Sequence, residues 1–255
     1  MPTWFGGLLM VVAAATLAQL VLTVVHKFRR VDAGRAIDNA MISAALGTVG
    51  GAYALFLSFT ISVVWHNYSD TQAGVAREAN AVANLERMSR GFSLPVQRDV
   101  QDSTRTYLRL TIDEEWPLLA KDESSVRADA SLIELWHIYT DVSPEERANP
   151  LYSQSITRLN EVGDARRLRL LAGTSGVPEL IVILLYTGAV ATMALACLYE
   201  MKSLTLHRIL LAFLAVVISF GLFLVGVLDS PFGSRLPISA EPFRYVLNHM
   251  QQLEY

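Results

Sequence analysis

The sequence predicts an all-α membrane protein: four transmembrane helices in two pairs, with a helical extramembrane domain between the second and the third. Four long apolar stretches, a charged middle segment and helical periodicity in that segment predict this fold class. A membrane-spanning helix needs about 20 mostly apolar residues, and a charge at the bilayer centre costs at least about 2.5 kcal/mol. The four stretches meet this length and contain no Asp, Glu, Lys or Arg: Trp4–Val25, Ile42–Trp65, Leu180–Tyr199 and Ile209–Leu228.

Charge is concentrated between the two apolar pairs. Of the 21 Lys and Arg and the 24 Asp and Glu residues, 30 lie between Ser69 and Gly176. We therefore expect four segments: residues 1–68 with the first two membrane helices, 69–177 as the helical domain, 178–229 with the last two membrane helices, and 230–255 as a C-terminal tail.

The lysines and arginines of the short connectors predict the orientation. Short loops rich in Lys and Arg stay in the cytoplasm, whereas long loops are translocated largely regardless of charge. The first connector holds Lys27, Arg29, Arg30 and Arg35, and the third holds Lys202 and Arg208. This count predicts a multi-pass protein of the inner membrane with the helical domain outside the cytoplasm.

The middle segment reads as four helices. Val75, Ala79, Val82 and Leu85 recur at helical spacing, so the second membrane helix is expected to continue to about Met88. A second helix is expected to open at Leu94-Pro95 and to end at Trp116-Pro117, because proline cannot continue a helix. The other two are expected at about Ser124–Tyr139 and from Ser143-Pro144 to about Leu171, where the last helix has a possible restart at Pro150.

Small and hydroxyl-bearing residues form a stripe on the second membrane helix. At about 100° per residue they fall within one narrow sector. We predict them as pore-lining residues: Gly47, Gly51, Ala54, Ser58, Ser62 and Trp65. Small residues also permit close helix–helix packing in membranes, which the pattern alone favours over a pore wall.

No catalytic, cofactor or metal site is predicted. The five histidines are scattered, and the single cysteine, Cys197, lies in the third apolar stretch. The acidic pairs Glu114-Glu115 and Asp122-Glu123 are expected to be solvated helix ends. The net charge of −3 argues against nucleic-acid binding. We expect no enzyme activity, and the predicted partners are the lipid bilayer, inorganic ions and further copies of the chain.

Two further segments are candidate sites. Arg166, Arg167 and Arg169 shortly precede the third membrane helix. They can form salt bridges to neighbouring helices, line a pore mouth or anchor the helix to lipid headgroups. Directly after the fourth membrane helix comes a short turn with Asp229, Pro231 and Phe232, in which Asp229 can cap the next turn.

These motifs carry a family resemblance. Asp229–Gly233 followed by Leu236-Pro237 resembles a segment of bestrophins. The chain as a whole resembles a bacterial bestrophin-like family. Its shared motifs are Trp65-x-x-Tyr68, Glu78-Ala79-Asn80, Glu115-Trp116-Pro117, Asp164–Arg167 and the turn at Asp229–Phe232.

The resemblance implies a pentameric ion channel with the second helices lining the pore and the helical domain in the cytoplasm, opposite to the charge count. Residues 224–228 are Leu-Val-Gly-Val-Leu, where calcium-responsive bestrophins carry acids, so no calcium site is expected. The function predicted is a bestrophin-like homo-oligomeric channel. The alternative is a non-conducting membrane scaffold or sensor that binds a partner through its helical domain.

Overall fold

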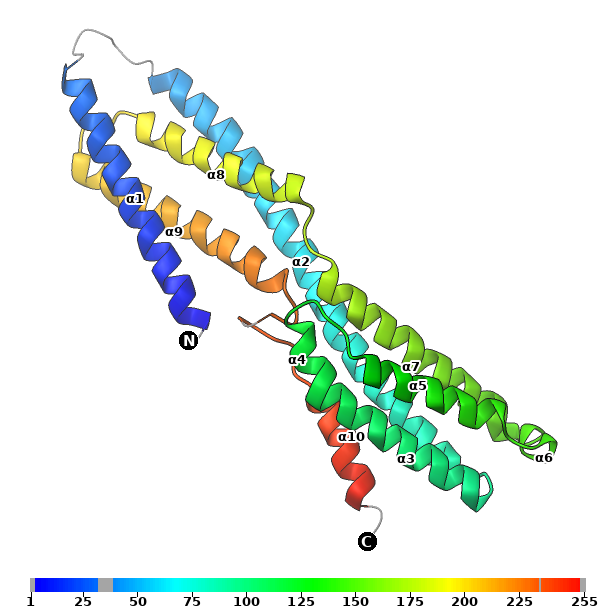
Figure 1. Ribbon diagram of the computed structural model, residues 1–255. Helices are drawn as coiled ribbons and strands as arrows, with labels where there is room; N and C mark the ends of the chain where they lie inside the picture. Colours follow the sequence, from blue (N-terminus) through cyan, green and yellow to red (C-terminus); the bar gives the residue numbers. More distant parts are fainter. Residues whose placement is uncertain (1–2, 32–38, 234, 253–255) are drawn as a thin grey trace. The chain divides into compact units, whose positions relative to one another are not determined.

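The computed structural model describes residues 3–31, 39–233 and 235–252, and Arg35 of the basic connector lies outside them. The chain divides into two compact units, 1–66 with 177–229, and 67–176 with 230–255. We call the first the membrane unit and the second the helical unit. Every element in Figure 1 is a helix.

The membrane unit contains four helices that are long and apolar enough to cross a bilayer. They are α1 (Thr3–Val31), the first part of α2 (Asn39–Ser89), α8 (Glu179–Leu198) and α9 (Leu204–Leu228). Their apolar windows have mean hydropathies between 1.7 and 2.8, so the four predicted spans are confirmed as helices.

Polar contacts fix the ends of these membrane helices. Asn39 at the start of α2 exchanges two hydrogen bonds with the backbone of Glu200, at 2.9 and 3.0 Å. The Ser203 hydroxyl accepts from the Leu206 N–H and caps α9. Between α1 and α9, the Gln19 amide donates to the Arg208 carbonyl at 2.9 Å. Because a helix end leaves backbone groups unpaired, the Ser203 bond stabilises the start of α9. The Asn39 and Gln19 bonds link α2 and α1 to the chain around the start of α9.

The helical unit is built from the remainder of α2 and six further elements besides a π-helical turn. In chain order they are α3 (Leu94–Leu110), the π-helix η1 (Thr111–Glu115), α4 (Trp116–Leu119), α5 (Val126–Thr140), α6 (Pro144–Arg147), α7 (Pro150–Thr174) and α10 (Glu241–Gln252). The second membrane helix continues to about Met88 as expected, and its apolar stripe is buried, with Val75, Val82 and Leu85 at 0% exposure. Tyr107 of α3 and Phe243 of α10 belong to the same core.

Two expectations for the helical unit differ from the structure. The second helix does not end at Trp116-Pro117 but runs through η1 into α4. The wider turn accommodates the proline: the Trp116 N–H donates to the Thr111 carbonyl, five residues back. The residues after Asp229 are no separate tail, since they include α10, whose Phe243, Val246 and Met250 are buried in the core of the helical unit.

Candidate functional site

The predicted pore-lining residues all lie on an exposed face of α2. Each of the six is exposed, and added Cβ atoms at Gly47 and Gly51 meet no atom within 4 Å. We call this surface, which comprises Gly47, Gly51, Ala54, Ser58, Ser62 and Trp65, the small face. Among the described residues, Gly47 and Gly51 are therefore not used to pack α2 closely against another helix of the chain.

The opposite side of α2 makes the contacts inside the membrane unit. Tyr53 and Leu57 are buried, and each lies against a glycine of another helix. A Cβ at Gly188 of α8 would lie 2.6 Å from the Tyr53 ring, and one at Gly221 of α9 would lie 2.7 Å from Leu57. The small residues that permit close packing are thus on α8 and α9, and they receive the bulky side of α2.

The hydroxyls of the small face differ from the buried hydroxyl on the same helix. Thr60 is buried, and its Oγ1 donates to the Phe56 carbonyl at 2.9 Å. Ser58 and Ser62 are exposed, and neither hydroxyl has a hydrogen-bond partner within the described part of the chain. These two hydroxyls are therefore accessible to water or to a group of another chain, which can hydrogen-bond to them, whereas lipid chains cannot.

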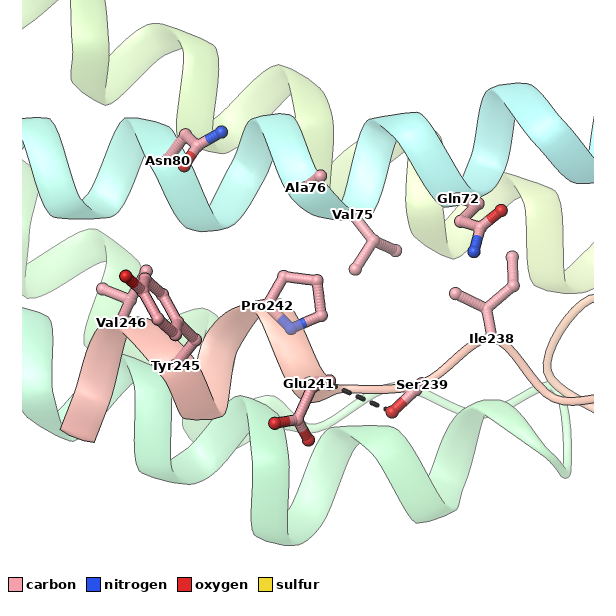
Figure 2. A pocket seen from close by; sticks show the side chains of 10 residues that line it. All are labelled: Gln72, Val75, Ala76, Asn80, Ile238, Ser239, Glu241, Pro242, Tyr245 and Val246. Atoms are coloured by element: carbon pink, nitrogen blue, oxygen red, sulfur yellow. Dashed lines mark hydrogen bonds between the residues drawn. The ribbon is translucent and has the colours of Figure 1, made fainter. Parts of the chain in front are cut away.

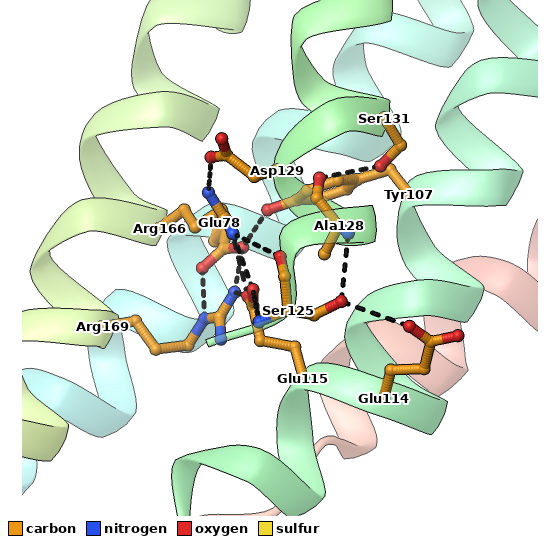
Figure 3. Close-up of polar contacts among 10 residues, drawn as sticks. All are labelled: Glu78, Tyr107, Glu114, Glu115, Ser125, Ala128, Asp129, Ser131, Arg166 and Arg169. Carbon is orange, nitrogen blue, oxygen red and sulfur yellow. Dashed lines mark hydrogen bonds and ion pairs between the residues drawn. The ribbon is translucent and has the colours of Figure 1, made fainter. Parts of the chain in front are cut away.

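Two of the three clustered arginines point into the helical unit, as Figure 3 shows. Arg166 is 5% exposed and donates to both Glu115 oxygens, at 3.2 and 2.7 Å. Arg169 is 2% exposed and donates to Glu78 at 2.8 and 3.0 Å and to Glu115 at 2.7 Å. Arg167 is exposed and pairs with Asp164 on its own helix at 2.8 Å.

We call Glu78, Tyr107, Glu115, Arg166 and Arg169 the buried ion network. It joins α2, α3, η1 and α7. The Tyr107 hydroxyl donates to Glu78 at 2.5 Å, and Asp129 of α5 accepts from Arg166 at 2.5 Å at the edge of the network. The negative charges of the two carboxylates balance the positive charges of the two guanidinium groups in the interior. Such a charge-balanced cluster, in which only Nη1 of Arg169 lacks a hydrogen-bond partner among the described residues, holds helices together, and its buried cations are not positioned to form a charged rim.

The pKa values within the network favour the charged pairs. Burial by itself would raise the pKa of Glu115, but Arg166 and Arg169 outweigh it and hold this pKa below its ordinary value. Burial would lower the pKa of Arg169, yet the charge and hydrogen bonds of Glu78 raise it. Burial and the neighbouring charge of Glu78 raise the pKa of Tyr107 well above 10. At pH 7 these directions keep Glu115, Arg166 and Arg169 charged and Tyr107 neutral.

The turn after α9 is held at both ends. The Asp229 carboxylate accepts from the Val177 N–H at 2.8 Å, which links the end of α9 to the start of α8. The Pro231 carbonyl accepts from the Ile238 N–H at 2.8 Å. Phe232 is buried and packs edge-on against Trp116 with ring centroids 5.6 Å apart, and Trp116 in turn lies 5.3 Å from the Arg169 guanidinium.

The sequence profile of the bestrophin-like domain matches residues 10–243. The chain belongs to the bestrophin-like family. A crystal structure of a variant of a bacterial bestrophin homolog from Klebsiella pneumoniae is similar to it, with a TM-score of 0.73 at 13% identity over 97% of this chain and 98% of that chain. Another crystal structure of a bacterial bestrophin homolog from the same organism gives a TM-score of 0.72 at 14% identity over 96% and 97%. No match to a curated protein is found.

These comparisons confirm the resemblance and the fold class of this bestrophin-like protein. They also give its sequence motifs a structural context. The expectation that Glu115 is part of a solvated helix end is wrong, because its side chain is fully buried between two arginines. In the sequence, Glu78, Glu115 and Arg166 each belong to a different family motif. These motifs are far apart along the chain, so their spacing does not show that the three residues contact one another.

Proposed function

We propose that this bestrophin-like protein is a subunit of a homo-oligomeric ion channel whose conduit is lined by the small face of α2. The observation that carries the proposal is the exposure of Ser58 and Ser62 with hydroxyls that have no partner in the described chain. A water-filled conduit supplies hydrogen bonds to such hydroxyls, whereas lipid chains do not.

The other exposed surfaces of the membrane unit support this assignment by contrast. Exposed side chains on α8 and α9 are large and apolar, as on a lipid-facing helix; examples are Leu180, Val190, Phe213 and Phe220, at 56% to 79% exposure. The small face itself has no comparable side chain before Trp65, and the exposed Leu55 and Phe59 of α2 lie beside it. Small side chains leave room for water and ions along the helix axis.

One α2 helix cannot enclose a conduit. Several copies arranged around a rotation axis can, and closed cyclic symmetry is the usual arrangement of such oligomers. The family resemblance implies five copies. In that arrangement the small faces of all α2 helices meet at the axis, and the bulky side of each α2 remains packed on α8 and α9.

Recording from planar lipid bilayers tests the proposal. The parent protein conducts, and Ser58→Lys or Ser62→Lys abolishes the current or inverts its charge preference, because either places a ring of positive charge in the conduit. Ser58→Thr, which keeps the hydroxyl, is the matched control and leaves a measurable current. An unchanged current in both lysine variants removes the pore assignment. An assembled parent protein that never conducts favours the scaffold or sensor function instead.

The orientation of the helical unit is tested separately, because the charge count places it outside the cytoplasm and the resemblance places it inside. Val126 is 82% exposed and is a suitable reporter. In intact cells, a membrane-impermeant thiol reagent labels Val126→Cys in a Cys197→Ala background if the charge count is right. Labelling only after the cells are opened establishes the cytoplasmic orientation.

A further inference from the structure

A pocket of about 450 Å³ lies in the helical unit between α2 and the chain that leads into α10. Figure 2 shows Gln72, Val75, Ala76 and Asn80 of α2 on one side and Ile238 to Val246 on the other. Its floor is apolar, with Val75, Ile238 and Val246 buried. At its outer edge, Glu241 and Tyr245 are exposed, so the pocket is open to a partner.

Glu241 gives this edge an acidic group. Its side chain is 73% exposed, and its nearest cationic group is Arg244, one turn away on α10, at 3.9 Å. At that distance and exposure the pair is weak, so the carboxylate is available to a second cation.

Arg77 lies on the exposed surface of α2, at the edge of that surface farther from Gln72. At about 100° per residue it is about 140° around the helix from Gln72 and about 60° from Asn80, the two polar α2 residues that line the pocket. It is exposed, and no described residue forms an ion pair with it. Along the helix axis it lies between Gln72 and Asn80, within about 7.5 Å of either, since the rise is about 1.5 Å per residue. Arg77 is therefore at the level of the pocket, at the edge of the exposed α2 surface opposite to Gln72.

A ring of identical subunits brings opposite edges together. In a head-to-tail interface, one edge of each copy contacts the other edge of the next, and groups at equal height along the axis face each other. We infer that Arg77 of each subunit docks at the pocket of the adjacent copy and pairs with that copy's Glu241. The occupant of the pocket is thus a second copy of this chain. This inference rests on the proposed oligomeric channel and adds the contact that closes its ring outside the membrane.

Cross-linking of two differently tagged chains tests the contact. One chain carries Arg77→Cys and the other Glu241→Cys, both in a Cys197→Ala background. They are co-expressed, purified in detergent and treated with a short bis-maleimide. A cross-linked product that contains both tags is expected, and it can arise only between copies. In the matched control, Arg98→Cys, an exposed position on α3, replaces Arg77→Cys and gives no such product.

Charge reversal provides a second measurement. Arg77→Glu or Glu241→Arg alone is expected to raise the concentration of half-assembly about tenfold, and the double reversal to restore it, because close interfacial charge pairs couple by about 1.5 kcal/mol or more. An assembled, conducting protein with neither cross-link nor rescue overturns this contact and leaves the proposed function intact. A parent protein that is a single copy in detergent and does not conduct overturns both.

Discussion

Arg169 on α7 and Glu78 on α2 form a two-point ion pair in the interior of the helical unit. The Nε–Oε2 and Nη2–Oε1 distances are 2.8 and 3.0 Å, and the two residues are 91 positions apart. Both side chains are at most 1% exposed. Because burial removes each charge from water, the other network members must supply almost all of the interactions that replace its hydration.

Removal of Arg169 is expected to destabilise the protein strongly. Arg169→Ala leaves Glu78 and Glu115 buried with one cation fewer, and breaking a buried pair in this way costs about 3–5 kcal/mol. Thermal unfolding of the purified protein in detergent, followed by circular dichroism, measures the loss. Arg167→Ala is the matched control two residues away, and its exposed pair with Asp164 is worth about 1 kcal/mol or less. Equal effects of the two substitutions would contradict the structural role of the network.

The stability of the helical unit is expected to fall in acid through Glu115. Its pKa in the folded protein is below the ordinary value of 4.5, so its contribution is fully present above about pH 4.5 and is lost as the pH falls through the lower, folded value. Unfolding followed between pH 6 and pH 3 tests this. Glu115→Gln removes part of the acid dependence, whereas Glu123→Gln, at an exposed loop position, leaves the slope as it is. A Glu115→Gln slope equal to that of the parent would count against the linkage.

Glycines on α8 and on α2 are expected to respond differently to alanine. Gly188→Ala places a methyl group 2.6 Å from the Tyr53 ring, and overpacking of this kind costs about 1–3 kcal/mol. Gly51→Ala meets no atom within 4 Å in the chain, and alanine favours the helix by about 1 kcal/mol. Melting temperatures in detergent compare the two. Gly51→Ala as the more damaging change would show that the small face packs tightly.

The sequence predicts the helices more fully than the site. Length and lack of charge mark the four spans because lipid imposes both requirements locally along the chain. The periodicity of Val75, Val82 and Leu85 likewise reports burial directly. The π-helical turn before Pro117 was not predicted, because proline removes a backbone donor whether the chain stops or widens its turn.

The spacing of residues along the sequence could not identify the partners of the clustered arginines. Arg166 and Arg169 bind Glu115 and Glu78, which are 51 to 91 residues distant. Charge alone is compatible with a lipid anchor, a pore mouth or an internal pair, and only the fold shows that two of the three are internal. For the small face, periodicity identified which residues share a surface. The structure adds that all six residues are exposed and that an added Cβ at Gly47 or Gly51 meets no atom within 4 Å.

Cysteine scanning from Phe56 to Val63 in a Cys197→Ala background tests whether the small face of α2 lines a conduit. A charged, water-soluble thiol reagent is applied during bilayer recording. We expect the current to change only where the thiol faces water, at Ser58→Cys and Ser62→Cys, and not at the buried positions Leu57 and Thr60. Block at the buried positions, or none at either serine, would contradict this expectation.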